Sequence, residues 1–149
     1  MAGVVCFTYV DNQPFFFMQE VQGQLEDFGG GKNFAQETPY ENALREFVEE
    51  TNGQFMLKYD DPFDEADMLL KLYTVRKLVV RGKYHLFILY IPPAYMKLQS
   101  HAFGYIENTD RIARICKWYS LGEVKQKFAE GKVHGRLYGP FRSWLHRNF

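Results

Sequence analysis

Apolar residues in this chain fall into short runs that turn-forming residues separate. Runs rich in β-branched and aromatic residues are typical of strands, and here they cover residues 4–10, 15–21, 55–59, 72–81, 83–91 and 112–119. Turn-forming residues 11–14 join the first two runs, which predicts a β-hairpin. Gly82 divides the fourth run from the fifth and predicts a second hairpin or a meander.

The apolar spacing becomes helical after Thr38. Thr38 is a suitable N-cap, Pro39 suits the first helical position, and Glu41 is placed to complete a capping box. Four apolar residues then predict a core-facing stripe: Ala43, Leu44, Phe47 and Val48. A second helix is predicted over residues 120–129 and a third over residues 140–149.

Two polar segments between these elements have no clear period. Residues 60–67 are acidic but lack the Asp-x-Asp-x-Asp-Gly spacing of a calcium loop, so we expect a solvated surface turn. Residues 94–108 form a long aromatic segment, which is a candidate substrate lid or side wall. A plain connection is the alternative for this segment.

The composition is that of one globular domain spanning residues 1–149. The aromatic fraction of 17% is high, and we expect most of these rings in the core. Cys6 and Cys116 have neither disulfide-framework nor metal-ligand spacing. We see no leader pattern and no apolar run of membrane-spanning length, so the predicted location is soluble and cytoplasmic.

Charge is balanced overall but uneven along the chain. Residues 1–110 carry 16 acidic and 9 basic residues, whereas residues 111–149 carry 2 and 9. The basic end either faces an anionic substrate or neutralises the acidic part of the fold, and the second is the simpler interpretation. No DNA-specific motif is present, and no pattern specifies an oligomeric state.

The predicted helix that starts at Thr38 carries three acids on one face. Glu46, Glu49 and Glu50 are three and four residues apart, so their carboxylates are neighbours and repel one another. Some cation must compensate this repulsion. Hard divalent cations with oxygen ligands, Mg²⁺ above all, are natural candidates.

These acids belong to a longer pattern that resembles the Nudix box, G-x5-E-x7-R-E-U-x-E-E-x-G-U, in which U is a bulky aliphatic residue. The matching residues are Gly31, Glu37, Arg45, Glu46, Phe47, Glu49 and Glu50. Aromatic Phe47 replaces the aliphatic residue, Asn52 replaces the usual glycine, and Gly53 replaces the last aliphatic residue. Because Asn tolerates the left-handed conformation, we expect Asn52 and Gly53 still to end the helix.

The resemblance implies an α/β fold, a Nudix-type α/β/α sandwich with a mixed β-sheet. It implies hydrolysis of a nucleoside diphosphate linked to another moiety, X, with Mg²⁺ or Mn²⁺ bound to the diphosphate. Catalytic roles fall on Glu46, Glu49, Glu50 and Arg45. Metal ligands would be the same three glutamates, the backbone carbonyl of Gly30, and a downstream acid, either Glu107 or Asp110.

Other residues of the pattern are expected to support these ligands. Arg45 lies one turn before Glu49 and is expected to orient its carboxylate, whereas Glu37 is expected to anchor Arg45 or the loop. Gly31 has a structural role. Candidate substrate contacts are Lys32 and Tyr105, and His101 is the one histidine worth testing.

The identity of X stays open at this point. Nucleotides, dinucleoside polyphosphates, nucleotide sugars and capped RNA all fit the family, and the basic end and aromatic segment weakly favour an extended anionic group. The alternative function is a non-catalytic Nudix-fold sensor of nucleotides or RNA.

Overall fold

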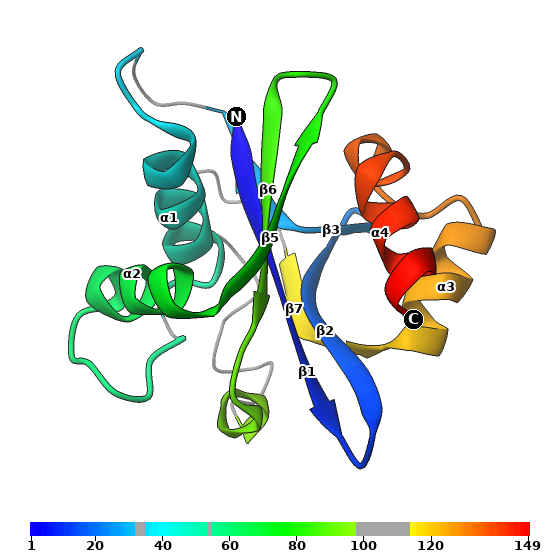
Figure 1. The fold of residues 1–149 in the computed structure, drawn as a ribbon, viewed down its shortest axis with the longest axis horizontal. Helices are drawn as coiled ribbons and strands as arrows, with labels where there is room; N and C mark the ends of the chain where they lie inside the picture. The colour runs from blue at the N-terminus through cyan, green and yellow to red at the C-terminus, as the bar shows by residue number, and fades with distance from the viewer. Residues whose placement is uncertain (32–34, 54, 98–113) are drawn as a thin grey trace.

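A mixed sheet forms the centre of the protein in the computed structural model, which describes residues 1–31, 35–53, 55–97 and 114–149. Within these residues the sheet has seven strands in the order β3-β2-β1-β6-β5, with β4 paired to β1 and β7 paired to β2 (Figure 1). The strands are β1 (Ala2–Val10), β2 (Gln13–Val21), β3 (Gln24–Glu26), β4 (Phe28–Gly30), β5 (Thr74–Val80), β6 (Tyr84–Tyr90) and β7 (Arg114–Ser120). The helices are α1 (Pro39–Glu50), α2 (Pro62–Tyr73), α3 (Leu121–Ala129) and α4 (Pro140–Asn148), with short 3₁₀ turns η1 (Pro93–Lys97) and η3 (Gly135–Leu137).

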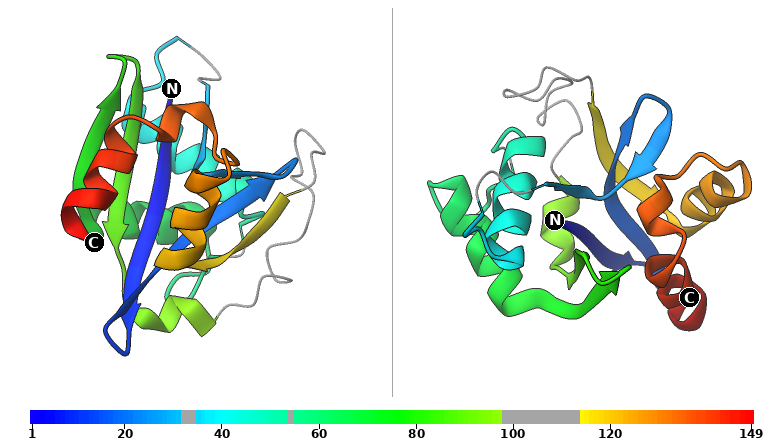
Figure 2. Two further views of the ribbon diagram at one scale, coloured as in Figure 1. Left: turned by 90° about the vertical axis from the view of Figure 1, so that its right-hand side faces the viewer. Right: turned by 90° about the horizontal axis from the view of Figure 1, so that it is seen from above.

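Strand β1 lies at the centre because it is apolar on both faces. Val4 and Cys6 face the core beneath α1 and α2, whereas Val5 and Phe7 face the core beneath α3 and α4. The strand pairs antiparallel with β2 and parallel with β6. Helices therefore cover both faces of one mixed sheet (Figure 2), which confirms the predicted α/β sandwich.

The first hairpin is confirmed, but its turn is shorter than predicted. Asp11 and Asn12 alone make the turn, with φ values of 51° and 63°, and Gln13 and Pro14 already belong to β2. Two central residues with positive φ match the twist of the flanking strands, and Asp and Asn tolerate that conformation.

The acidic segment 60–67 was predicted as a surface turn, and this was wrong because α2 begins inside it. The Asp61 side chain accepts hydrogen bonds from the N–H groups of Phe63 and Asp64, and Pro62 takes the first helical position. Acids in a first turn also interact favourably with the helix dipole. The same residues that resembled a solvated turn are therefore a helix start.

Two strand predictions also need correction. The predicted run 72–81 begins only at Thr74, because its first two residues end α2. The predicted strand 55–59 does not form; Phe55 packs instead between the rings of Phe17 and Tyr95. Aromatic packing, rather than sheet pairing, holds this segment.

The C-terminal part follows its sequence signals. Ser120 and Glu123 form the capping box of α3, and α4 begins at Pro140, so both predicted helices are confirmed. Of the candidate lid, residues 94–97 belong to η1, and residues 98–108 lie outside the described residues. No helix in the described part of the chain is long and apolar enough to cross a membrane.

One buried carboxylate ties α2 to its surroundings. Glu65 is 0% exposed and accepts hydrogen bonds from the N–H groups of Lys58 and Tyr59, at 2.8 and 2.7 Å, and from the Tyr95 hydroxyl. Burial raises the pKa of Glu65, but these hydrogen bonds outweigh it and hold the pKa below its usual value of 4.5.

We predict that Glu65→Gln lowers the free energy of unfolding by about 1–3 kcal/mol, because the hydrogen bonds from the Lys58 and Tyr59 N–H groups would then end on a neutral amide oxygen instead of a charged carboxylate. Since the folded-state pKa is depressed, the contribution of Glu65 is present above the unfolded-state pKa and is lost as pH falls through the folded-state pKa. Urea unfolding at pH 7 and pH 4 measures both effects. Asp64→Asn, in the exposed first turn of α2, is the matched control; an equal loss in both variants contradicts the prediction.

Candidate active site

Helix α1 is delimited at both ends by the residues that the sequence indicates. The Thr38 hydroxyl accepts from the Glu41 N–H at 3.1 Å and the Glu41 carboxylate accepts from the Thr38 N–H at 3.0 Å, which is the predicted capping box. At the other end, the N–H groups of Asn52 and Gly53 donate to the carbonyls of Glu49 and Val48.

This C-terminal pattern is a Schellman motif with Asn52 in the left-handed position, at a φ of 54°, followed by Gly53 at 65°. The expectation that Asn52 and Gly53 end the helix is confirmed. The departure from the family pattern at Asn52 therefore leaves the local backbone geometry intact.

The acidic face of α1 lies largely inside the protein. The apolar stripe packs on the sheet as predicted, with Ala43, Phe47 and Val48 buried. Glu46 and Glu50, however, are only 8% and 4% exposed. Carboxylates buried this deeply require partners within the fold.

The guanidinium group of Arg45 gathers the first set of carboxylates. Its Nε and Nη2 donate to the two oxygens of Glu37, at 2.8 and 3.1 Å, and its Nη1 donates to Glu46 and Glu49, at 3.1 and 3.0 Å. Nη2 also donates to the Gly31 carbonyl at 2.7 Å. The hydrogen bonds to Glu37 raise the pKa of Arg45 above its usual value. The cation that compensates Glu46 and Glu49 in this structure is therefore an arginine.

Glu50 has a separate cationic partner. Its carboxylate lies 3.0 Å from Nη1 of Arg114 on β7 and accepts from the Gln19 amide on β2 at 3.1 Å. Arg114 also donates to the side-chain amide oxygen of Gln19 at 3.3 Å, so Glu50, Gln19 and Arg114 each contact the other two. Burial raises the pKa of the nearby Cys116 to about 12, so its protonated thiol donates to the Glu50 carbonyl.

The glycine segment before α1 is shaped by close approaches on its two faces. A Cβ on Gly30 would lie 2.7 Å from Oε1 of Glu46, and a Cβ on Gly29 would lie 2.8 Å from the Ala2 carbonyl oxygen. A Cβ on Gly31 would meet no described atom within 4 Å. Gly29 and Gly30 are therefore both tight positions, and Gly30 is the one that the resemblance named as a backbone metal ligand.

The structure brings together Glu37, Arg45, Glu46 and Glu49, with Gly30 and Gly31 beside them. Four candidates lie outside the described residues: Lys32, Tyr105, Glu107 and Asp110. His101 lies outside them as well.

Sequence reasoning missed Gln19 and Arg114, the partners of Glu50. No local pattern identifies them, because Gln19 lies 31 residues and Arg114 64 residues from Glu50 along the chain. The one available signal was the excess of basic residues after residue 110.

The oxygen atoms of the site suit a hard divalent cation, although in this structure the carboxylates contact the guanidinium group of Arg45. Glu46 and Glu49 offer carboxylate oxygens beside a glycine backbone, which are the ligands that Mg²⁺ prefers. Among the described residues, no three His, Cys, Asp or Glu side chains are grouped to hold a metal ion. A metal ion at Glu46 and Glu49 would have to share these carboxylates with Arg45.

Comparisons with known proteins add one finding. No protein-family model and no curated protein matches the chain. Among solved structures, the chain is similar to an Ap4A hydrolase from C. elegans, solved as a binary complex, with 18% sequence identity and a TM-score of 0.48. The match covers 98% of this chain and 91% of that chain. Similarity at this level assigns neither a substrate nor the role of any residue.

We predict that Gly29→Ala lowers the free energy of unfolding by about 2 kcal/mol or more, because the new methyl group meets the Ala2 backbone. Gly31→Ala, two positions later, is the matched control and should change stability by less than about 0.5 kcal/mol, since that side of the backbone is open. Urea denaturation measures both. A loss of stability in Gly31→Ala as large as that in Gly29→Ala would refute the close contact between Gly29 and the Ala2 backbone.

Proposed function

We propose that this protein is a metal-dependent pyrophosphohydrolase of the Nudix type. Its substrate would be a nucleoside diphosphate linked to another moiety, X. The observation that carries the proposal is the convergence of Glu46 and Glu49 on one guanidinium group beside the Gly30–Gly31 segment. Carboxylates spaced in this way suit a cation-bound diphosphate.

Residues of the site would divide the work as follows. Glu46, Glu49 and Glu50 would hold Mg²⁺ or Mn²⁺, with the Gly30 carbonyl and a downstream acid, Glu107 or Asp110, as further ligands. A bound Mg²⁺ or Mn²⁺ neutralises diphosphate charge and lowers the pKa of bound water. Glu46 is a candidate to accept the proton of the attacking water. Water adds to phosphorus, the bridging P–O bond breaks, and two phosphate products leave.

Arg45 would act as the positioning residue. It contacts Glu46 and Glu49 through a single nitrogen, Nη1, so it fixes the two carboxylates relative to each other. Glu37 holds the remainder of the guanidinium group in a two-oxygen, fork-like contact. The geometry of the acidic pair thus depends on a residue that need not touch the substrate.

One observation favours the alternative, a nucleotide or RNA sensor without turnover. Each box glutamate already has an arginine partner, Arg45 for Glu46 and Glu49 and Arg114 for Glu50. A site neutralised in this way binds a divalent metal less readily than free carboxylates do. A sensor would bind its ligand without metal and release no phosphate product.

Glu49→Gln is the sharpest test of the proposed function, because Glu49 is only partly buried and its neutral variant leaves the core undisturbed. We predict that the wild type hydrolyses at least one member of a panel of nucleotides, dinucleoside polyphosphates, nucleotide sugars and capped RNA with Mg²⁺ or Mn²⁺. Glu49→Gln should lower kcat/KM by about 10²-fold or more. Mn²⁺ affinity, measured by electron paramagnetic resonance, should fall in parallel.

Glu41→Gln is the matched control, since Glu41 is exposed on the same helix and glutamine also completes a capping box. It should leave both activity and Mn²⁺ affinity unchanged. Ligand binding that survives Glu49→Gln, with no turnover by the wild type, would establish the sensor instead.

A further inference from the structure

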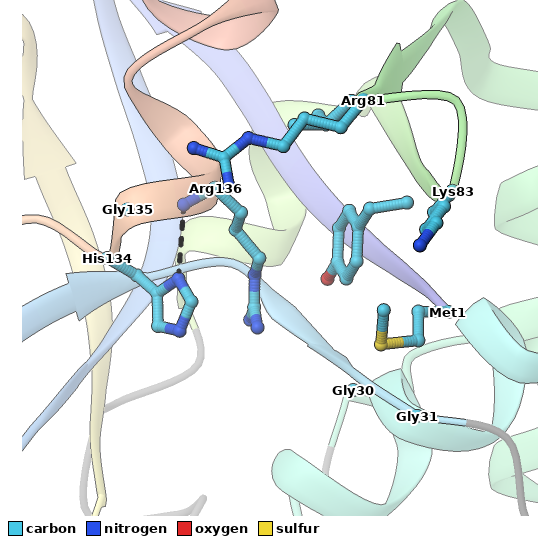
Figure 3. A pocket seen from close by; sticks show the side chains of 10 residues that line it. Met1, Gly30, Gly31, Arg81, Lys83, His134, Gly135 and Arg136 are labelled. Atoms are coloured by element: carbon cyan, nitrogen blue, oxygen red, sulfur yellow. Dashed lines mark hydrogen bonds between the residues drawn. The ribbon is translucent and has the colours of Figure 1, made fainter.

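A cavity of about 720 Å³ borders the same glycine segment that α1 contacts. Gly30 and Gly31 form one of its walls, the turn between β5 and β6 forms a second, and residues 134–136 form a third (Figure 3). The Gly30–Gly31 backbone meets Glu46 and Arg45 of the candidate active site. The cavity and the acidic cluster are therefore neighbours across one stretch of backbone.

The basic side chains known to line this cavity are two arginines, one lysine and one histidine. Arg81 and Lys83 reach it from the β5–β6 turn, and His134 and Arg136 reach it from the segment after α3 (Figure 3). None of its described lining residues is acidic. A concave site lined by one sign of charge concentrates ligands of the opposite sign.

Arg136 is fixed in place by the layer beneath the cavity. Its Nε donates to the buried Asp27 carboxylate at 2.7 Å, and its guanidinium lies 4.7 Å from the centroid of the Tyr84 ring. The Tyr84 hydroxyl donates to the other oxygen of Asp27. Asp27 and Glu26 together take up the charge of Arg136. In the described part of the chain, Arg81 and Lys83 have no acidic partner, so their charges stay uncompensated there.

His134 adds a neutral donor to this cationic wall. Its Nδ1 accepts the Arg136 backbone N–H at 3.2 Å, so in the neutral ring the proton is on Nε2. Burial, and then Arg136, lowers the pKa of His134, which keeps the ring neutral near pH 7. The ring lines the cavity and supplies Nε2–H as a donor (Figure 3).

We propose that this cavity binds phosphate groups on the X moiety of the substrate, so that preferred substrates carry at least one phosphate beyond the cleaved diphosphate. This inference rests on the proposed function for the identity of the substrate, but the binding of phosphate by the cavity does not. Two uncompensated cations, a fixed guanidinium and a histidine donor make a site for a polyphosphate chain. The cavity is large enough for more than one phosphate group.

The first test is binding of inorganic tripolyphosphate to the whole protein in EDTA, measured by calorimetry. Lys83→Glu should weaken binding by about tenfold or more, the effect of losing one charge-assisted hydrogen bond. Arg81→Asn should weaken it similarly; asparagine is chosen because residue 81 has a φ of 53°. Lys77→Glu, exposed on β5 outside the cavity, is the matched control and should bind as the wild type does.

The second test compares two substrates in the presence of Mg²⁺. Lys83→Glu should raise KM about tenfold for a dinucleoside tetraphosphate and leave KM for an ADP-sugar, whose X carries no phosphate, unchanged. Equal tripolyphosphate affinity in Lys83→Glu, Lys77→Glu and the wild type overturns the inference even if the enzyme is active. Absence of turnover with normal, Lys83-dependent tripolyphosphate binding instead overturns the proposed function and retains the phosphate site.

Discussion

The contacts of the Arg45 guanidinium are the interaction on which the candidate site depends. One planar cation joins Glu37 in the loop before α1, Glu46 and Glu49 on the helix, and the Gly31 carbonyl at the end of β4. Repulsion between the carboxylates would otherwise drive them apart. Removing the arginine from such a network typically costs about 3–5 kcal/mol, because the buried carboxylates of Glu37 and Glu46 would then lack compensation.

The same logic extends to the whole molecule, because the basic end of the chain neutralises acids in the first part. Arg114 pairs with Glu50, Lys127 pairs with Glu20, and Arg136 pairs with Asp27 and Glu26. These contacts support the simpler interpretation of the uneven charge. They also explain why Glu50 of α1 can be buried: its counter-charge, Arg114, lies on β7 in the distant C-terminal part, whereas Glu46 is compensated by Arg45 of its own helix.

Capping residues close to one another in the sequence correctly predicted where α1 begins and ends. The start and end of α1 follow from Thr38, Glu41 and the Asn52–Gly53 pair, since caps act over three or four residues. Helix α2 was missed because the acids on both sides of Pro62 were interpreted as solvated, although Asp61 caps the helix and Asp64 and Glu65 interact favourably with its dipole.

Long-range features lay beyond such reasoning. The pairing of Glu50 with Arg114 requires β7 to lie beside β2, and the sequence contains no local trace of that neighbour. The basic cavity likewise needs the β5–β6 turn and the segment after α3 to meet at the glycine segment. Strand order, which depends on how the whole core packs, decides both.

The alternation of β4 explains why an acidic cluster and a basic cavity can share one backbone segment. Successive residues of a strand face opposite sides, so the missing side chain of Gly30 admits Glu46 while that of Gly29 admits the Tyr84–Asp27 pair that supports Arg136. A larger residue at Gly30 would displace Glu46, and a larger residue at Gly29 would displace Tyr84 and Asp27. At Gly31 the described surroundings are open. A chain of phosphates held at both sites would therefore pass over Gly31, which follows the end of β4 and has no described atom within 4 Å of the position that its Cβ would take.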